Sequence, residues 1–213
     1  MKAQKTLYHI ILDRSGSMSS CLESTINGFN EQVTQIRRLE EQFPEQAFTI
    51  GLSLFNDRIH HHAFGKAPAE MPLLTGETYR PGGSTALLDA IGSTLLQLET
   101  DLKAAQATLP TTLVVVVITD GYENASREFQ LNDIRKMISR LEATGLWTFS
   151  FLGATLDAVD VAERMSFKRE NSMYFDKESM DHDVWVKLGN SMSSYSNRKR
   201  HGGRTDILFD ENL

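Results

Sequence analysis

The spacing of apolar positions along the chain switches between two periods, and this predicts the order of strands and helices. Residues 7–12 form an apolar run typical of a buried strand. From there to Leu39, apolar residues recur every three or four positions, which predicts an amphipathic helix. Residues 48–55 alternate apolar and polar, and residues 58–64 offer a partner strand after a short turn. These two segments predict a hairpin.

The second half of the chain repeats this alternation around the most hydrophobic run in the sequence. Residues 113–118 are one leucine, four valines and one isoleucine. Such an unbroken run favours a central parallel strand covered on both faces. One further helix is expected to begin at Thr85, and another, marked by Ile134, Ile138 and Leu141, to end near Gly145. We also expect helices over residues 159–165 and 184–192, and strands over residues 147–152 and 172–175.

The order of elements predicts an α/β fold. We expect a doubly wound, mostly parallel central sheet of about six strands, with one antiparallel edge strand and helices on both faces. A chain of 213 residues fits one such domain, which we assign to residues 1–196. Residues 197–213 are polar, contain glycine and separate basic from acidic positions. We expect them to form a C-terminal tail outside the core.

Composition and charge narrow the classes of function. The formal net charge is −6, which weighs against nonspecific binding to nucleic acid or to a membrane surface, since both need a basic face. The basic run at residues 198–200 is too short to change that view. No window approaches the roughly 20 apolar residues that span a bilayer, and no signal-like apolar segment begins the chain. We therefore expect a cytoplasmic protein.

Oxygen-bearing side chains gather at the predicted ends of two strands. Asp13, Ser15 and Ser17 follow the first strand at alternate positions, and Asp120 follows the valine-rich strand. Thr85 comes shortly after a Pro-Gly-Gly sequence. Ligands of open α/β sheets bind beyond the carboxyl ends of strands, where the strand order reverses, so we expect these segments to meet if the two strands are neighbours. Hard oxygen ligands suit a small hard cation such as Mg²⁺.

Each of these residues also has a plain structural explanation. The acids can form turns at strand ends, the serines can cap a helix, and Thr85 can be the N-cap of the helix that follows. Turns and helix caps can account for any one of these residues, but they account poorly for all five occurring together. The combination favours a cation site, which we call the five-residue site.

The five-residue site and the glycines beside it resemble the metal-ion-dependent adhesion site of von Willebrand factor type A (VWA) domains. The matching segments are Asp13-x-Ser15-x-Ser17, Thr85 after Gly82-Gly83, and Thr119-Asp120-Gly121. The resemblance extends in strand–helix order over most of the chain and implies the Rossmann-like VWA fold. The chain is also similar to free-standing bacterial VWA proteins, some of which are linked to stress responses or tellurium resistance.

The resemblance implies how each residue would act. The serine hydroxyls would coordinate the ion directly, the threonine directly or through water, and the two aspartates largely through bound waters. The implied ion is Mg²⁺, with Mn²⁺ or Ca²⁺ as alternatives. Its open position would accept a Glu or Asp carboxylate from a protein partner. The expected rim around that position consists of Gly83, Ser84, Gly121 and Asn124.

The chemistry of the five-residue site supports a binding function. Neutral hydroxyls leave the charge of a divalent ion poorly neutralised, so an incoming carboxylate is attracted electrostatically. We therefore predict a protein-binding module that depends on a divalent cation and is not an enzyme.

A metal-dependent phosphatase or hydrolase on a similar sheet is the principal alternative. Phosphatases that use an aspartate after the first strand need a second acid two residues later, where this chain has Ser15. Glycine-rich nucleotide motifs and Gly-x-Ser-x-Gly are absent, and no general base beside the ion is evident. A structural subunit with a vestigial site is a third class. The sequence leaves the partner and the oligomeric state open.

Overall fold

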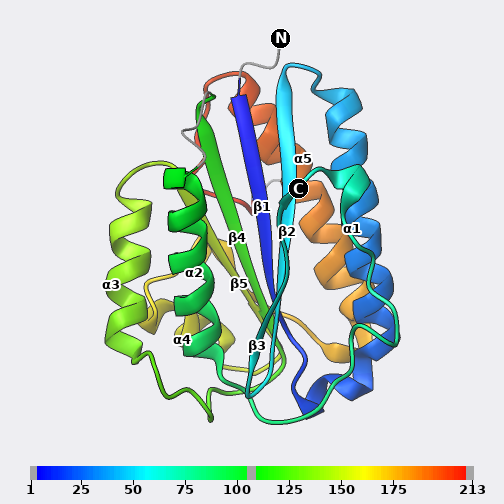
Figure 1. The fold of residues 1–213 in the computed structure, drawn as a ribbon, viewed down its shortest axis with the longest axis vertical. Coiled ribbons are helices and arrows are strands. Elements are labelled where there is room, and N and C mark those ends of the chain that lie inside the picture. The colour runs from blue at the N-terminus through cyan, green and yellow to red at the C-terminus, as the bar shows by residue number, and fades with distance from the viewer. Residues whose placement is uncertain (1–3, 105–108, 210–213) are drawn as a thin grey trace.

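A six-stranded sheet with the order β3-β2-β1-β4-β5-β6 runs through the middle of the molecule (Figure 1). The structure, a computed structural model, describes residues 4–104 and 109–209. The strands are β1 (Gln4–Asp13), β2 (Gln46–Phe55), β3 (Ile59–Lys66), β4 (Thr111–Thr119), β5 (Trp147–Gly153) and β6 (Ser172–Tyr174). Neighbouring strands are parallel except β2 and β3, where β3 forms an antiparallel edge. The predicted fold class is confirmed.

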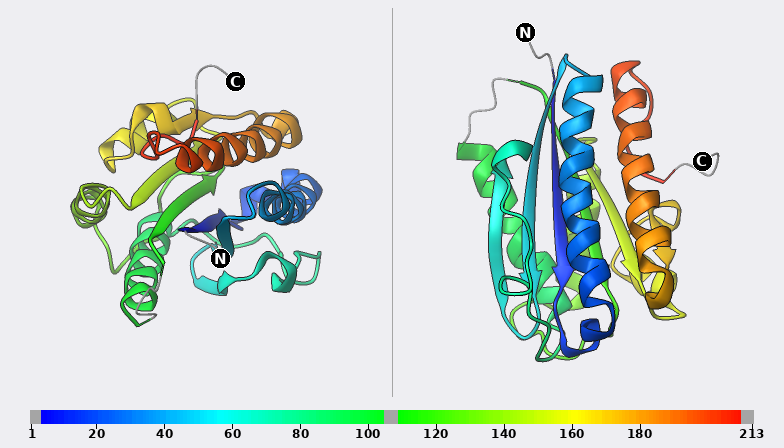
Figure 2. Two further views of the ribbon diagram at one scale, coloured as in Figure 1. Left: turned by 90° about the horizontal axis from the view of Figure 1, so that it is seen from above. Right: turned by 90° about the vertical axis from the view of Figure 1, so that its right-hand side faces the viewer.

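Helices cover both faces of the sheet. They are α1 (Leu22–Gln42), α2 (Leu87–Ala104), α3 (Leu131–Glu142), α4 (Ala158–Arg164) and α5 (Lys187–Arg200). α1 and α5 lie side by side on one face, and α2, α3 and α4 lie on the other (Figures 1 and 2). Among the helices in the described residues, none is both long enough and apolar enough to cross a membrane.

The two faces have separate apolar cores because strand side chains alternate in direction. On β1, Tyr8 and Ile10 pack toward α1 and α5, whereas Leu7 and Ile11 pack toward α2. Residues 113–118 of β4 are fully buried, as the valine-rich run predicts for a strand covered on both faces. β1 and β4 therefore form a rigid centre for the loops at their carboxyl ends.

The start of α2 differs from the prediction for Thr85. The helix begins at Leu87, and Ala86 holds the capping position, because the Ala86 carbonyl accepts the first helical hydrogen bond from the Ala90 amide at 3.0 Å. Thr85 as N-cap is therefore wrong. The amides that a capping side chain would serve donate elsewhere, that of Leu88 to Glu123 Oε2 at 2.9 Å and that of Asp89 to Ser126 Oγ at 3.0 Å, so the side chain of Thr85 is not needed to cap the helix.

The C-terminal segment also differs from the expected polar tail. α5 continues to Arg200, and the Lys199 ammonium is buried, where it donates to the Thr6 and Thr112 hydroxyls at 2.8 Å each. Leu208 and Phe209 are buried in the core beside α1 and α5. Packing on the domain therefore extends to Phe209, beyond the predicted boundary at residue 196. Residues 210–213 lie outside the described residues.

Candidate metal-ion site

The carboxyl ends of β1 and β4 emerge at the same edge of the sheet. The two strands pair in parallel, with Leu12 opposite Ile118, so Asp13 and Asp120 leave neighbouring strands at nearly the same level. β2 lies on one side of β1 and β4 on the other, so the strand order reverses between β1 and β4. This is the position at which open α/β sheets bind their ligands.

Asp13 is buried and held from three directions. Its Oδ1 accepts a hydrogen bond from the Ser15 amide at 2.6 Å, and its Oδ2 accepts one from the Thr119 hydroxyl at 2.6 Å. Its backbone carbonyl accepts a hydrogen bond from the Tyr79 hydroxyl at 2.6 Å. Burial raises the pKa of Asp13 to about 6, although the hydrogen bonds from Thr119 and Ser15 act in the opposite direction. A nearby cation would favour its charged form.

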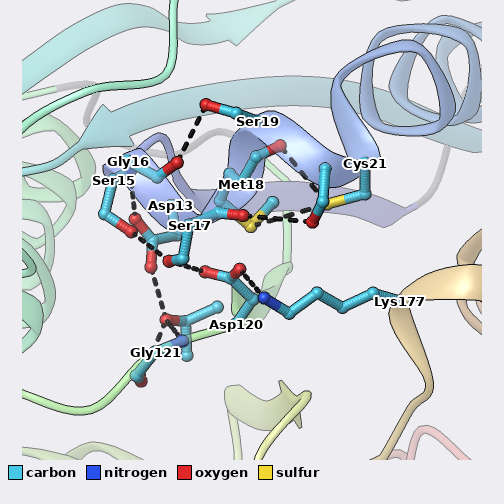
Figure 3. Close-up of polar contacts among 12 residues, drawn as sticks. Asp13, Ser15, Gly16, Ser17, Met18, Ser19, Cys21, Asp120, Gly121 and Lys177 are labelled. Atoms are coloured by element: carbon cyan, nitrogen blue, oxygen red, sulfur yellow. Dashed lines mark hydrogen bonds and ion pairs between the residues drawn. The ribbon is translucent and has the colours of Figure 1, made fainter.

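Ser15, Ser17 and Asp120 form a connected row of oxygens (Figure 3). The two serine hydroxyls are 3.1 Å apart, and Ser17 Oγ donates to Asp120 Oδ1 at 2.6 Å. Ser15 and Asp120 are buried, whereas Ser17 is exposed. Two of the three predicted segments therefore meet through direct side-chain contacts.

The loop before Thr85 is tied to the segment after β1 by backbone hydrogen bonds. The Gly16 amide donates to the Gly83 carbonyl at 3.1 Å, and the Gly82 amide donates to the Arg14 carbonyl at 2.9 Å. Gly83 has a φ of 79°, and an added Cβ there would lie 2.3 Å from Asp57 Oδ1. The positive φ therefore favours glycine at this position.

Thr85 is held beside the other hydroxyls by Asn124 and Gly121. The Thr85 amide donates to Asn124 Oδ1 at 2.9 Å, and the Asn124 amide donates to the Thr85 carbonyl at 3.0 Å. A Cβ added at Gly121 would lie 3.3 Å from Thr85 Oγ1 and 3.7 Å from Ser17 Oγ. The Thr85 and Ser17 hydroxyls therefore border the same small space. The structure brings the third segment to the other two.

The structure places the four predicted rim residues differently. Gly83 and Ser84 are exposed, and Gly121 lies directly beside the two hydroxyls. The amide oxygen of Asn124 is engaged by the Thr85 backbone, so this side chain positions the loop.

The donors present fit a hard divalent cation. All five side chains offer oxygen, the ligand type that Mg²⁺ and Ca²⁺ prefer. Asp120 Oδ2 is buried without a well-directed hydrogen bond, and its contact is the Lys177 ammonium at 2.5 Å. Over residues 4–104 and 109–209 there is no cluster of three or more His, Cys, Asp or Glu side chains placed to hold a metal. A site built here would rely on hydroxyls together with two carboxylates.

Three residues that contact the site were not predicted to do so. Thr119 and Tyr79 orient Asp13, and Lys177 pairs with Asp120. The position of Thr119 at the end of the valine-rich strand was a usable signal, since it precedes Asp120 directly. Lys177 lies in a segment without any motif, so only the fold brings it to this edge.

Comparisons with known proteins show similarity in sequence and in fold. The sequence model of the von Willebrand factor type A domain matches residues 9–184. A search of curated proteins gives no match.

Three solved structures illustrate the similarity in fold. A von Willebrand factor type A protein from Catenulispora acidiphila has a TM-score of 0.59 and 12% identity, covering 91% of this chain and 43% of that chain. Proximal thread matrix protein 1 from the mussel byssus, with a zinc-occupied MIDAS motif, has a TM-score of 0.55 and 15% identity, covering 90% and 45%. The ArnB paralog VWA2 from Sulfolobus acidocaldarius has a TM-score of 0.55 and 14% identity, covering 88% and 46%. The chain spans less than half the length of these solved chains.

Proposed function

Because this chain belongs to the von Willebrand factor type A domain family, we propose that it is a protein-binding module that depends on a divalent cation and has no catalytic activity. Domains of this family are generally metal-dependent interaction modules, and one structure with the same fold carries zinc in its MIDAS motif. The observation that carries the proposal is the meeting of oxygen donors from three separate segments at the β1–β4 edge.

The proposed ligands of the cation are the five residues Asp13, Ser15, Ser17, Thr85 and Asp120, with Mg²⁺ as the ion and Mn²⁺ or Ca²⁺ as alternatives. When bound, the ion would supply an open coordination position for a Glu or Asp carboxylate of a protein partner. The serine and threonine hydroxyls supply neutral donors. The buried aspartates supply the charge that attracts the ion.

The hydrogen bonds around the site prepare it for this role. The Ser15 amide and the Thr119 hydroxyl fix the direction of the Asp13 carboxylate, so its orientation does not have to be gained on binding. The ties between the Gly83 and Gly16 backbones keep the Thr85 loop in place. Gly83, Ser84 and Gly121 leave a rim with little side-chain bulk around the open position.

Hydrolysis is disfavoured by the way the two acids are engaged. Both oxygens of Asp13 accept hydrogen bonds, and those of Asp120 contact Ser17 and Lys177. A metal-dependent hydrolase needs a base free to activate water beside the ion. With Asp13 and Asp120 both assigned to the cation, neither is left to serve as that base. A cytoplasmic role in a bacterial stress response is the context that the resemblance to free-standing VWA proteins suggests.

Calorimetric titration with Mg²⁺ and with Mn²⁺ tests the cation site. Ser17→Ala removes one exposed ligand and should lower the affinity by at least about tenfold, on the order of 1.4 kcal/mol. Ser20→Ala is the matched control, because Ser20 is also exposed on the same turn and its hydroxyl donates to the backbone carbonyl of Ser17, at 3.2 Å, and not to a proposed ligand atom. Equal loss in both variants, or no binding by the wild type, would rule out the proposed ligands.

Partner capture with and without chelator tests the binding function. A genuine partner is retained by the wild type in Mg²⁺ and lost both in chelator and on Ser17→Ala. Hydrolysis of p-nitrophenyl phosphate with Mg²⁺ or Mn²⁺ tests the alternative. Turnover that Ser17→Ala abolishes would establish an enzyme instead.

A further inference from the structure

A lysine from outside the five-residue site reaches its buried carboxylate. Lys177 begins the short 3-10 helix η4 (Lys177–Ser179), which contacts the 3-10 helix η1 (Gly16–Cys21) that follows β1. The Lys177 ammonium lies 2.5 Å from Asp120 Oδ2 (Figure 3). The Asp120 side chain is 0% exposed in this pair and that of Lys177 is 33% exposed. A fully buried carboxylate is therefore paired with a lysine whose side chain is still partly exposed.

The backbone of Lys177 is fixed, but its side chain is free to leave. Phe175 and Met180, on either side of η4, are buried in the core. The Asp176 side chain caps η4 by accepting a hydrogen bond from the Glu178 amide at 3.0 Å. From this anchored backbone, the flexible four-carbon stem of lysine can swing its ammonium away from Asp120 without refolding η4.

The Lys177 ammonium and a divalent ion would compete for the negative charge of the Asp120 carboxylate. Asp120 Oδ1 is taken by the Ser17 hydroxyl, which leaves Oδ2 as the oxygen that faces Lys177. Two cations held a few ångströms apart repel strongly in a buried site, where water screens them poorly. An ammonium on Asp120 therefore opposes a metal ion between Asp120 and the serine hydroxyls.

We propose that Lys177 determines the cation affinity of the site as a tethered competitor, which a divalent ion must displace from Asp120. The inference rests on the proposed function, because it concerns the same five residues. The divalent ions that bind the two aspartate carboxylates most strongly displace the Lys177 ammonium most readily. The affinity of the site is then set by a residue that is not itself a ligand.

Calorimetric titration with Mn²⁺ at pH 7 tests this directly. Lys177→Met keeps the length and apolar stem but removes the charge, and it should lower the dissociation constant by about tenfold or more. Lys177→Arg keeps a cation beside Asp120, and its dissociation constant should stay within about threefold of the wild type. Lys136→Met, on the exposed face of α3, is the control for loss of a surface lysine and should leave affinity unchanged.

Thermal unfolding gives a second readout. Without metal, Lys177→Met should be less stable than the wild type, because the buried Asp120 carboxylate loses its cation. Mn²⁺ should then raise its unfolding temperature more than that of the wild type. In the double variant Asp120→Asn with Lys177→Met, the gain in affinity should disappear.

The outcomes separate the two proposals. If Lys177→Met binds Mn²⁺ no more tightly than a metal-binding wild type, the competitor role is wrong and the proposed function stands. If Lys177→Met binds Mn²⁺ and the wild type does not, the competitor role is supported and the cation dependence of the wild type is overturned. If neither binds, both proposals are overturned.

Discussion

The hydroxyl of Thr119 donates a 2.6 Å hydrogen bond to Asp13 Oδ2 and joins the ends of the two central strands. Both side chains are buried. The contact links residues that are far apart in the sequence, and it fixes the direction of the most deeply placed acid of the five-residue site. Pairing of β1 with β4 and formation of the site are therefore coupled.

Thr119→Val should weaken both the fold and the site. Valine has nearly the same shape but no hydroxyl, so the buried Asp13 carboxylate loses one of its donors. We expect a loss of about 1–3 kcal/mol in the free energy of unfolding, measured by guanidinium denaturation. The pKa of Asp13 should rise further, and Mn²⁺ affinity should fall in calorimetry at pH 7.

Thr119→Ser is the control for this change, because it retains the hydroxyl. It should keep the cation affinity close to that of the wild type, with a smaller loss of stability from the missing methyl group. If Thr119→Val and Thr119→Ser behave alike, the hydrogen bond to Asp13 is not what supports the site.

Gly121→Ala should impair the site while leaving the fold intact. The new methyl group would lie 3.3 Å from Thr85 Oγ1 and 3.7 Å from Ser17 Oγ, inside the space that the hydroxyls border. Gly82→Ala is the matched control, since nothing lies within 4 Å of a Cβ at that position and neither glycine has a positive φ. We expect at least about a tenfold loss of Mn²⁺ affinity for Gly121→Ala only, because the methyl group displaces ligands. Equal affinities of the two variants would place the cation elsewhere.

The buried Lys199 should make the free energy of unfolding increase with pH in the alkaline range. Burial lowers the pKa of Lys199 from 10.5 to about 8, so between these pH values the unfolded chain binds more protons than the folded protein. The free energy of unfolding contributed by this group therefore rises with pH across that window. From pH 7 to pH 9.5 the gain should be roughly 1–2 kcal/mol.

Lys199→Met supplies the reference for this measurement. The variant lacks the titrating group, so the difference in stability between it and the wild type should change with pH by the amount given above. Denaturation curves at several pH values measure that difference. If the difference in the free energy of unfolding stays constant from pH 7 to pH 9.5, the pKa of Lys199 is not lowered by burial.

The order of strands and helices was predictable because each element follows a clear period. The valine-rich run of β4 indicated a central strand, but the sequence left open whether β4 lies beside β1, and the structure shows that it does. The convergence of Asp13, Ser17 and Asp120 was therefore predictable only on the condition that these strands pair. It also depended on strand ends, which the change from an apolar run to polar residues marks at Asp13 and at Asp120.

The remaining features depend on contacts that no local pattern records. Thr85 looked like an N-cap because it precedes a helical run, but its carbonyl accepts a hydrogen bond from the Asn124 amide and the helix starts only at Leu87. Lys199 looked like part of a solvated basic run, although three hydrogen bonds compensate its burial. Lys177 reaches Asp120 only because η4 packs on η1.

The attachment of α5 to the sheet bears on how the protein is made in the cell. Lys199 bonds the Lys5 carbonyl at 2.7 Å and the Thr6 hydroxyl at 2.8 Å, and the Tyr8 hydroxyl donates to the Met192 carbonyl at 3.3 Å. These contacts join the first strand to the last helix across nearly the whole chain. While the ribosome is still synthesising α5, the face of β1 that this helix covers has no partner. We therefore expect the domain to reach its full stability only after residue 199 has left the ribosomal exit tunnel.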